Sequence, residues 1–216
     1  MNSIFSKKAL SKEFLANEAF KKSKIAQVVQ WVTRTDGVSQ YWQLSEPIVI
    51  PANKDFRITQ TILGTNNSFE GLLDSTDSSF WLRLMPTSQG RNIQGWIIDD
   101  YISSVPHSDV NLRDGNYHTV TLSRVNGVIY VIYDGNIIEE ITKADGFNIH
   151  RLARFSTAEF GGVYKDFEVS IGGVLVNQIP LTNKGQGATQ LATVGDVNAF
   201  MPNYSSDVWE VDSANS

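Results

Sequence analysis

The run from Arg113 to Ile141, RDGNYHTVTLSRVNGVIYVIYDGNIIEEI, most constrains what this chain can fold into. Two Asx-Gly pairs, Asn126-Gly127 and Asp134-Gly135, lie eight residues apart in it. Both residues of such a pair tolerate positive φ, so each pair suits a two-residue hairpin turn. The segments around them are rich in β-branched and aromatic residues, which favour strands. The run therefore predicts an antiparallel meander with strands at 117–125, 128–134 and 136–142.

The same alternation of short strand-like segments and turns continues through most of the chain. Gly, Asn, Asp and Ser cluster between the segments. The other predicted strands are 39–44, 47–50, 55–63, 69–73, 79–85, 93–98, 150–156, 163–171 and 173–179. Many short strands at this spacing indicate a two-sheet sandwich. No repeat of fixed period is present, which argues against a propeller or a solenoid.

Three segments resemble one group of folds. The order Asp-Gly, aromatic-His-Thr-Val, Ser-Arg, Asn-Gly, Tyr-x-x-Tyr-Asp-Gly at 114–135 is similar to the central signature of laminin-G-like and concanavalin A-like domains. Residues 36–44 resemble their opening strand, and residues 161–169 resemble their closing strand. The resemblance spans roughly 34–179 and implies an all-β, antiparallel two-sheet jelly-roll sandwich. It implies little about function, because this fold hosts lectins, glycosidases, adhesion modules and virion proteins.

The charge is unevenly distributed along the chain. Residues 1–24 hold six Lys and two Glu, whereas residues 25–216 hold 12 basic and 21 acidic side chains. The acidic body argues against nucleic-acid binding, which needs a basic face. Hydrophobic residues of the first segment fall near one helical stripe, so a short N-terminal helix is expected over about 8–23 with a strand after it. The basic start is either a solvated helix face or a surface for an acidic partner.

The chain divides into three predicted parts. Residues 1–30 form an N-terminal helical docking segment, residues 31–180 the sandwich, and residues 181–216 an irregular strap packed on it. The strap resembles C-terminal segments of tailed-phage and prophage virion proteins, through Pro180–Lys184, Gly187–Leu191 and Asp207–Glu210. If the sandwich closes without the N-terminal helix, the apolar stripe of that helix needs a second copy or a particle protein to cover it, so a homo-oligomer is expected.

Composition excludes several classes of protein. No apolar stretch approaches the roughly 20 residues that a membrane span needs, so no membrane span is expected. No apolar signal-peptide core follows Met1, which favours synthesis in a host cytoplasm. The absence of cysteine excludes disulfides and cysteine zinc sites. These features suit a bacterial or phage origin better than a secreted animal lectin.

No motif of a known enzyme stands out. Glucanases of this fold use a Glu-x-Asp-x-Glu strand, whereas here Glu210-Val211-Asp212 lacks a third carboxylate. Glu139 and Glu140 are adjacent on a strand and face opposite sides. The three histidines are scattered, with no zinc-site spacing, and no Gly-x-Ser-x-Gly motif is present. The chain is therefore not expected to be an enzyme.

The best binding candidates lie in residues 86–116, the longest segment poor in strands, where binding function often concentrates on rigid scaffolds. Aromatic planes beside acidic side chains suit a glycan. The predicted glycan ligands are Trp96, Asp99, Asp100, Tyr101, His107 and Asp109. Oxygen ligands also suit calcium, with Asp99, Asp109 and Asn111 as candidates. The alternatives are packing aromatics and solvated turn residues.

Three hypotheses follow. The first is a non-enzymatic virion component of a tailed phage or prophage, located in the virion, which binds host cell-surface glycan or other virion proteins. The second is a free-standing bacterial carbohydrate-binding lectin module. The third, a diverged glycan hydrolase, is the least favoured because of the missing carboxylate.

Overall fold

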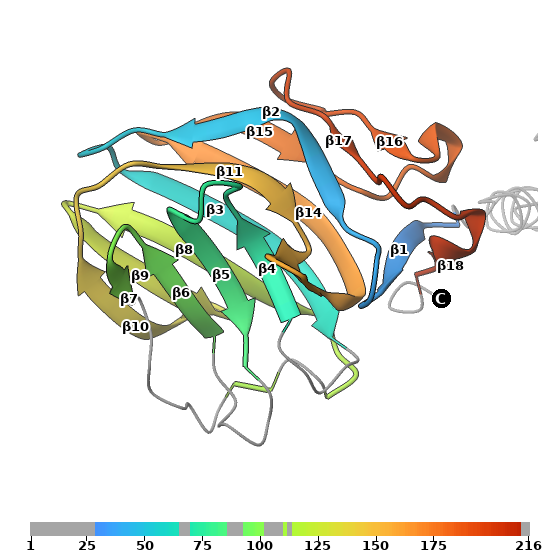
Figure 1. Ribbon diagram of the computed structural model, residues 1–216, viewed down its shortest axis with the longest axis horizontal. Coiled ribbons are helices and arrows are strands. Elements are labelled where there is room, and N and C mark those ends of the chain that lie inside the picture. The colour runs from blue at the N-terminus through green and yellow to red at the C-terminus, as the bar shows by residue number, and fades with distance from the viewer. Residues whose placement is uncertain (1–28, 65–69, 86–92, 102–109, 112–113, 213–216) are drawn as a thin grey trace, which may run out of the picture.

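Two large antiparallel sheets lie face to face in the computed structural model (Figure 1), which describes residues 29–64, 70–85, 93–101, 110–111 and 114–212. The first sheet runs in the order β10 (Asn136–Thr142), β9 (Val128–Tyr133), β8 (His118–Val125), β3 (Phe56–Gly64), β14 (Gly161–Ile171), β1 (Trp31–Asp36) and β18 (Trp209–Val211), with β15 (Val174–Ile179) also paired to β14. The predicted two-sheet sandwich is confirmed.

The second sheet runs in the order β16 (Thr189–Gln190), β17 (Ala199–Phe200), β2 (Trp42–Ile50), β11 (Phe147–Leu152), β4 (Glu70–Asp74), β5 (Phe80–Leu84), β6 (Ile93–Ile97) and β7 (Asp100–Tyr101). β12 (Arg154–Phe155) and β13 (Ala158–Glu159) form a small hairpin that is not paired with a strand of either sheet. Two short 3-10 turns, Lys184–Gln186 and Ser206–Val208, interrupt the C-terminal segment. The predicted N-terminal helix lies outside the described residues.

The predicted meander is present as β8, β9 and β10. Asn126 and Gly127 take φ values of 52° and 80°, and Asp134 and Gly135 take 45° and 82°. These are the left-handed conformations that a type I′ hairpin requires at both turn residues. The local sequence therefore fixes these two turns and, through them, the strand order of this edge.

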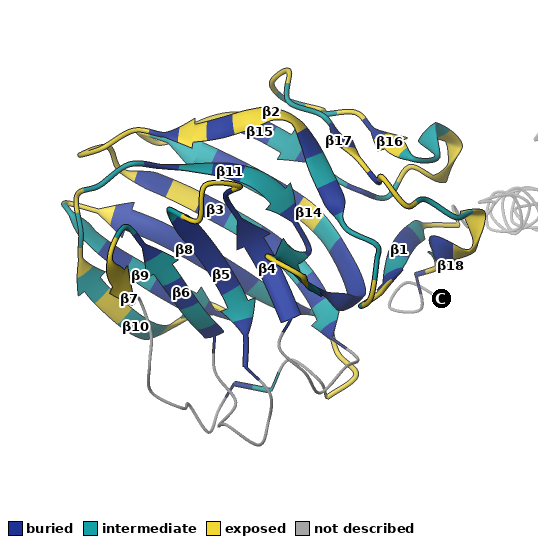
Figure 2. Ribbon diagram, in the orientation of Figure 1, coloured by how far each residue is buried: buried dark blue, intermediate teal, exposed yellow. Residues whose placement is uncertain are grey.

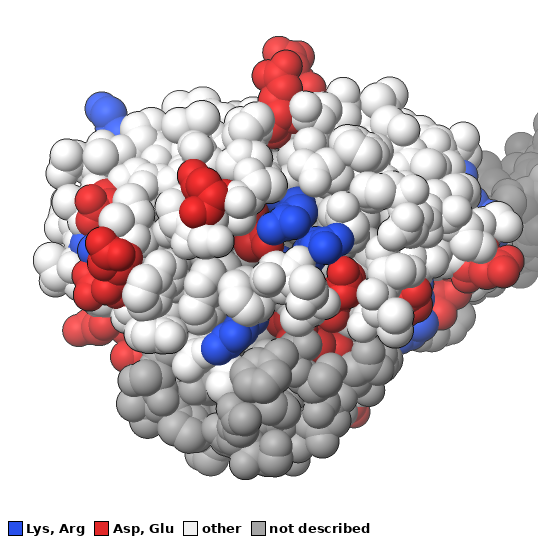
Figure 3. All heavy atoms as spheres, in the orientation of Figure 1, with Lys and Arg blue, Asp and Glu red and all other residues white. Residues whose placement is uncertain are grey.

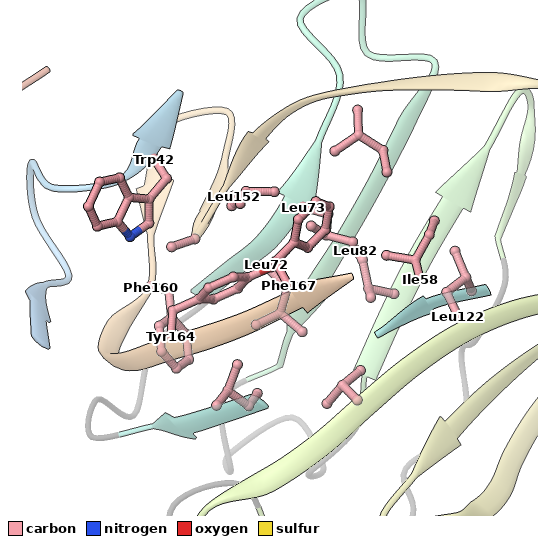
Figure 4. Packing of buried hydrophobic residues seen from close by; sticks show 14 of the residues in the cluster. Trp42, Ile58, Leu72, Leu73, Leu82, Leu122, Leu152, Phe160, Tyr164 and Phe167 are labelled. Carbon is pink, nitrogen blue, oxygen red and sulfur yellow. The ribbon is translucent and has the colours of Figure 1, made fainter. Parts of the chain in front are cut away.

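The core fills the space between the sheets with alternate residues of each strand. On β5, for example, Phe80, Leu82 and Leu84 point inward and are almost fully buried. Phe160, just before β14, and Tyr164 of β14 lie near Trp42 of the second sheet, and Phe167 of β14 packs beside Leu72 and Leu73 of β4 (Figure 4). Burial of these large side chains is the main favourable contribution to folding.

The strand predicted over 150–156 ends early, at Leu152. Ala153 has a φ of 59°, and its carbonyl accepts a hydrogen bond from the Phe160 amide at 2.9 Å. The chain therefore turns out of the sheet and returns as the β12–β13 hairpin, which contacts the outer face of β4. All five residues of β4 are consequently buried (Figure 2), since the core covers one face and the hairpin the other.

Arg124, at the end of β8, ties together two of the connections that cross between the sheets. Its guanidinium donates to the carbonyls of Pro51 and Lys54, in the β2–β3 connection, at 2.6 and 2.8 Å. It also donates to the carbonyl of Asp145, in the β10–β11 connection, at 2.6 Å. The side chain is 1% exposed and its cation lies over the Phe56 ring. Backbone carbonyls thus satisfy a buried charge without a paired carboxylate.

The C-terminal segment adds strands to both sheets. β17 pairs with β2, and β18 pairs with β1. Gln190, 1% exposed, holds together residues 183–190 ahead of these strands, because its side chain donates to the carbonyls of Asn183 and Gly187 and accepts from the Asn183 amide. The segment is therefore part of the sandwich packing and not a free tail.

We expect Arg124→Met to lower the free energy of unfolding by about 3 kcal/mol or more, because a hydrogen bond to a charged group contributes roughly 1.5–3 kcal/mol and buried carbonyls would lose their donor. Arg57→Met is the matched control, since Arg57 is exposed and, among the described residues, its side chain bonds to Thr59 alone. Urea unfolding measures both variants. Equal losses would show that Arg124 does not hold the crossovers together.

His118, which is 8% exposed, lies between two carboxylates. Its Nδ1 is 2.7 Å from Asp134 Oδ2, and its Nε2 is 2.9 Å from Asp114 Oδ1. Burial works against the charged ring, but the hydrogen bonds and charges of the two aspartates outweigh it and raise the pKa of His118. The same contacts, with the Asn116 amide, lower the pKa of Asp114 to about 2.

Because the pKa of His118 is higher in the folded chain, its contribution to stability is fully present below the unfolded value of about 6.5 and is lost as pH rises through the folded value. We therefore expect the stability difference between the wild type and His118→Gln to shrink above neutral pH. Thermal melts of both proteins, recorded at intervals of about one pH unit from pH 5 to 9, measure this difference. A difference that does not change with pH would contradict the charged pairing.

Candidate functional site

One row of residues crosses the outer face of the second sheet. Each member is paired in register with the next one on the neighbouring strand. Alternate side chains of a strand point to the same face, so the row presents its side chains together. From β2 to β7 the row is Gln43, Arg151, Asp74, Trp81, Trp96 and Tyr101. One half of it is polar and the other half is aromatic.

The aromatic half is a ladder of three rings. Trp81 and Trp96 are nearly parallel, with an interplanar angle of 5° and centroids 6.4 Å apart. The Tyr101 ring stands edge-on to Trp96 at 4.7 Å. Trp81 is 8% exposed, Trp96 is partly exposed, and Tyr101 is 54% exposed. The apolar surface that solvent reaches therefore lies on Trp96 and Tyr101, and the Trp81 ring packs beside them.

Phe155 extends the aromatic surface on its other side. The β12–β13 hairpin carries its ring to 4.8 Å from Trp81, and the Arg83 guanidinium lies over both rings, 4.6 Å from Trp81 and 5.0 Å from Phe155. This approach depends on Gly71 of β4. A Cβ at Gly71 would fall 1.8 Å from the Phe155 amide nitrogen, so only glycine fits under the hairpin.

The polar half is an ion pair. The Arg151 Nε and Nη2 atoms contact the two Asp74 carboxylate oxygens at 2.7 and 2.5 Å, in the bidentate geometry that guanidinium and carboxylate favour. Asp74 Oδ2 also accepts from the Ser156 amide at 3.0 Å. Burial raises the pKa of Asp74, and the bonds from Arg151 and Ser156 oppose that shift.

The loop between β4 and β5 forms a rim beside this pair. Ser75 Oγ accepts from the Phe80 amide, which closes the loop. The hydroxyls of Ser75 and Ser79, together with the Ser79 amide, lower the pKa of Asp77 to about 2. Ser78 has a φ of 62°, a left-handed conformation that serine seldom adopts. The rim is thus built from short, hydroxyl-bearing residues.

A hollow of about 190 Å³ lies between this rim and the hairpin. It is lined by Asp74, Ser75, Thr76, Ser78, Phe80, Trp81, Arg151, Phe155 and Ser156. On the face of the molecule that carries the second sheet, basic side chains gather near the middle and acidic ones flank them (Figure 3). The hollow therefore combines an aromatic wall, a cationic group and hydroxyls.

Among the residues predicted from the sequence, the row brings together Trp96 and Tyr101. Asp99 and Asp100 lie at the β6–β7 turn, where Ile98 and Asp99 have positive φ. Asp100 is 2.6 Å from Lys143 Nζ. His107 and Asp109 lie outside the described residues.

Asn111 contacts the first sheet, where its backbone interacts with the Tyr133 hydroxyl. No group of three His, Asp or Glu side chains suitable for a metal ion occurs within the described ranges. The proposed calcium set of Asp99, Asp109 and Asn111 therefore stays a prediction.

The carboxylates of the Glu210-Val211-Asp212 strand are engaged in contacts within the sandwich. Glu210 receives two hydrogen bonds from Arg34, at 2.7 and 2.9 Å. Asp212 is 2% exposed and contacts Lys165 Nζ at 2.8 Å and the Tyr117 hydroxyl at 3.0 Å. These bonds give both side chains a structural role at the edge of the first sheet.

Four site residues could not be found by sequence reasoning: Asp74, Trp81, Phe155 and Arg151. They come from β4, β5, β11 and β12. Strand register makes Asp74, Trp81 and Arg151 neighbours, and the β12–β13 hairpin carries Phe155 to them. One sequence signal was the alternation of Phe80 and Trp81, because adjacent strand residues face opposite sides and a buried Phe80 puts Trp81 on the outer face. Gly71 in the interior of a strand was a second possible signal, because such a glycine often marks a close approach of another backbone.

Comparison with known proteins identifies the fold. No protein-family model and no curated protein sequence matches the chain. Among solved structures, the chain is similar to a putative carbohydrate binding protein from Bacteroides ovatus, with a TM-score of 0.54, 12% identity and coverage of 82% of this chain and 61% of that one. It is also similar to the full extracellular region of zebrafish Gpr126/Adgrg6, with a TM-score of 0.50, 17% identity and coverage of 86% and 26%.

A heptameric SAP-like pentraxin from Limulus polyphemus is a further match, with a TM-score of 0.48, 14% identity and coverage of 66% of this chain and 76% of that one. The predicted laminin-G-like or concanavalin A-like sandwich is confirmed at the level of fold. The described residues contain no helix able to cross a membrane. The likeness of residues 180–210 to virion proteins is not tested by these matches.

We expect Gly71→Ala to push the β12–β13 hairpin off β4 and to lower stability by about 1–3 kcal/mol, the usual cost of overpacking. Tryptophan fluorescence should change as Phe155 withdraws from Trp81. Thr157→Ala, at the exposed tip of the hairpin, is the control and should alter neither property. Unchanged fluorescence in Gly71→Ala would show that the glycine does not set the position of Phe155.

Proposed function

We propose that this chain is a non-enzymatic glycan-binding module that uses the outer face of its second sheet. One observation carries the proposal, namely the register that places an aromatic ladder beside an ion pair and a hollow. A sugar ring needs an apolar platform for its CH face and fixed polar groups for its hydroxyls, close together. Trp96, Tyr101 and Phe155 supply the first, and Arg151 with the rim hydroxyls supplies the second.

The matched Bacteroides protein supports the proposal, since it is described as a putative carbohydrate binding protein on a similar sandwich. The site is small and shallow, so one copy would bind weakly. Useful affinity would come from several copies acting together. This reasoning agrees with a homo-oligomer assembled through residues 1–30, which the sequence predicts.

The number of carboxylates in the hollow supports binding without hydrolysis. Glycoside hydrolysis usually needs two carboxylates that flank the scissile bond. Asp74 is the only carboxylate among the residues that line the hollow, and both of its oxygens are bonded to Arg151. Within the described part of the chain, the hollow therefore lacks the second acid that a glycosidase would use.

We further propose that the module works in the virion of a tailed phage or prophage. The support is the sequence resemblance of Pro180–Lys184, Gly187–Leu191 and Asp207–Glu210 to C-terminal segments of such proteins. In this setting the sandwich would face host glycan, and residues 1–30 would dock to other particle proteins. A free-standing bacterial lectin module is the alternative, and mass spectrometry of purified particles separates the two.

The test of glycan binding is a glycan array probed with the full chain. Trp96→Ala should weaken binding about tenfold, the size expected when a ring contact of roughly 1.5 kcal/mol is lost. Its melting temperature should change little, because Trp96 lies on the outer face of the sheet. Tyr130→Ala is the matched control, since Tyr130 is a partly exposed aromatic on the first sheet.

Two outcomes would count against the proposal. If no glycan on a broad array binds the wild type, the site is not a lectin site. If Trp96→Ala and Tyr130→Ala bind equally well, the binding face lies elsewhere.

A further inference from the structure

We propose that the hollow beside Trp81 selects an acidic sugar, that is, a single sugar ring that carries a carboxylate or sulfate group. This inference rests on the proposed glycan-binding function and names the class of ligand. Three observations support it: the size of the hollow, its free hydrogen-bonding groups, and the charge around it.

The size of the hollow limits the ligand to one ring. Its volume is about 190 Å³, below the roughly 300–1,000 Å³ of sites that enclose drug-sized ligands. The β4–β5 rim closes one side and Phe155 with Ser156 closes another. One sugar unit therefore enters the hollow, and its neighbours in a longer chain would lie over Trp96 and Tyr101.

The hollow offers a ligand one cationic donor and several hydroxyls, but among the described residues that line it no free carboxylate acceptor. In many sugar sites a carboxylate accepts hydrogen bonds from sugar hydroxyls. Here the Asp74 side chain is 3% exposed and accepts from Arg151 and Ser156, so it has no surface to offer a ligand. The ligand must instead bring the acceptor, and an anionic group is the strongest acceptor that a sugar carries.

Arg151 supplies the matching donor. Its Nε and Nη2 atoms bond to Asp74, whereas Nη1 makes no hydrogen bond to a described residue. The side chain is 17% exposed and lines the hollow, so a ligand can reach it. Asp74 fixes the guanidinium in place, which lowers the entropy cost of binding. The side chains of Thr76, Ser78 and Ser156 add hydroxyls around the same space.

The surroundings of the hollow are more basic than the rest of the chain. Residues 25–216 hold 12 basic and 21 acidic side chains, yet three arginines lie in or next to the segments that line the hollow. Arg83 lies over the Phe155 ring, Arg154 precedes Phe155, and Arg151 lies across Asp74. Two carboxylates, Asp74 and Glu159, pair with Arg151 and Arg154 at 2.5 and 3.4 Å. Together with the ionised rim carboxylate of Asp77, these groups carry no net charge, so the acidic excess of residues 25–216 is absent around the hollow and does not repel an anion.

The first experiment compares matched sugars on the wild-type chain. Methyl glucuronide and methyl glucoside form one pair, methyl galacturonide and methyl galactoside a second, and oligosaccharides with and without sulfate a third. Ligand-observed NMR should show at least about tenfold tighter binding of one acidic member than of its neutral twin. Binding of that member should weaken as NaCl is added, and binding of the neutral twin should not.

The second experiment removes the Asp74–Arg151 ion pair and keeps side chains of similar size at both positions. The double variant Asp74→Asn with Arg151→Gln replaces the ion pair with two amides of similar size. It should lose the preference for acidic sugars and keep residual neutral binding through Trp96. The double variant Arg34→Gln with Glu210→Gln, which removes an ion pair of the first sheet, is the charge-matched control. If the Asp74–Arg151 double variant does not fold, the salt titration of the wild type still decides.

The outcomes separate this inference from the proposed function. If neutral sugars bind as tightly as their acidic twins, the selection for an anion is wrong, while glycan binding stands. If the acidic preference survives in the Asp74–Arg151 double variant, Arg151 is not the selecting group and the inference is overturned. If no sugar of either kind binds, the proposed function fails and this inference fails with it. Preference for carboxylate over sulfate, or the reverse, identifies the anionic group.

Discussion

The contacts of Arg124 with backbone carbonyls hold together two connections between the sheets and so help to set the position of one sheet on the other. Each sheet is stable as a sheet through its own ladder bonds, but its position on the other depends on the crossing connections. Two of these connections, at 51–55 and 143–146, deliver carbonyls to a single guanidinium. Gly146 allows the crossings to meet, because a Cβ there would fall 2.6 Å from the Ile50 carbonyl oxygen.

The binding row depends on these connections in turn. β2 ends at the first of these connections and β11 begins at the second. The two strands pair side by side, and their pairing sets Arg151 opposite Gln43. A shift of one residue would turn Arg151 towards the core and a core side chain outward. The row is therefore a consequence of how the crossings are fixed, and the polar half of the site is tied to a buried cation on the other sheet.

The β12–β13 hairpin shows how one irregular step creates a surface. A regular strand over 150–156 would have remained in the plane of the second sheet. The left-handed Ala153 turns the chain outward, Gly71 lets it settle on β4, and the Ser156 amide anchors it to Asp74. The same aspartate thus positions both the hairpin and Arg151. This sharing explains why a carboxylate in the site can be structural and leave recognition to the arginine.

Local sequence determined the sandwich class and the meander, because alternation and Asx-Gly turns act within a few residues of each other. It also pointed to Trp96 and Tyr101, since aromatic residues near a strand-poor segment are visible without a fold. It could not find Asp74, Arg151 and Phe155, which join the site through pairings between distant segments. Register and crossovers are long-range choices set by core packing and by Arg124, so only the tertiary structure decided which side chains share a face.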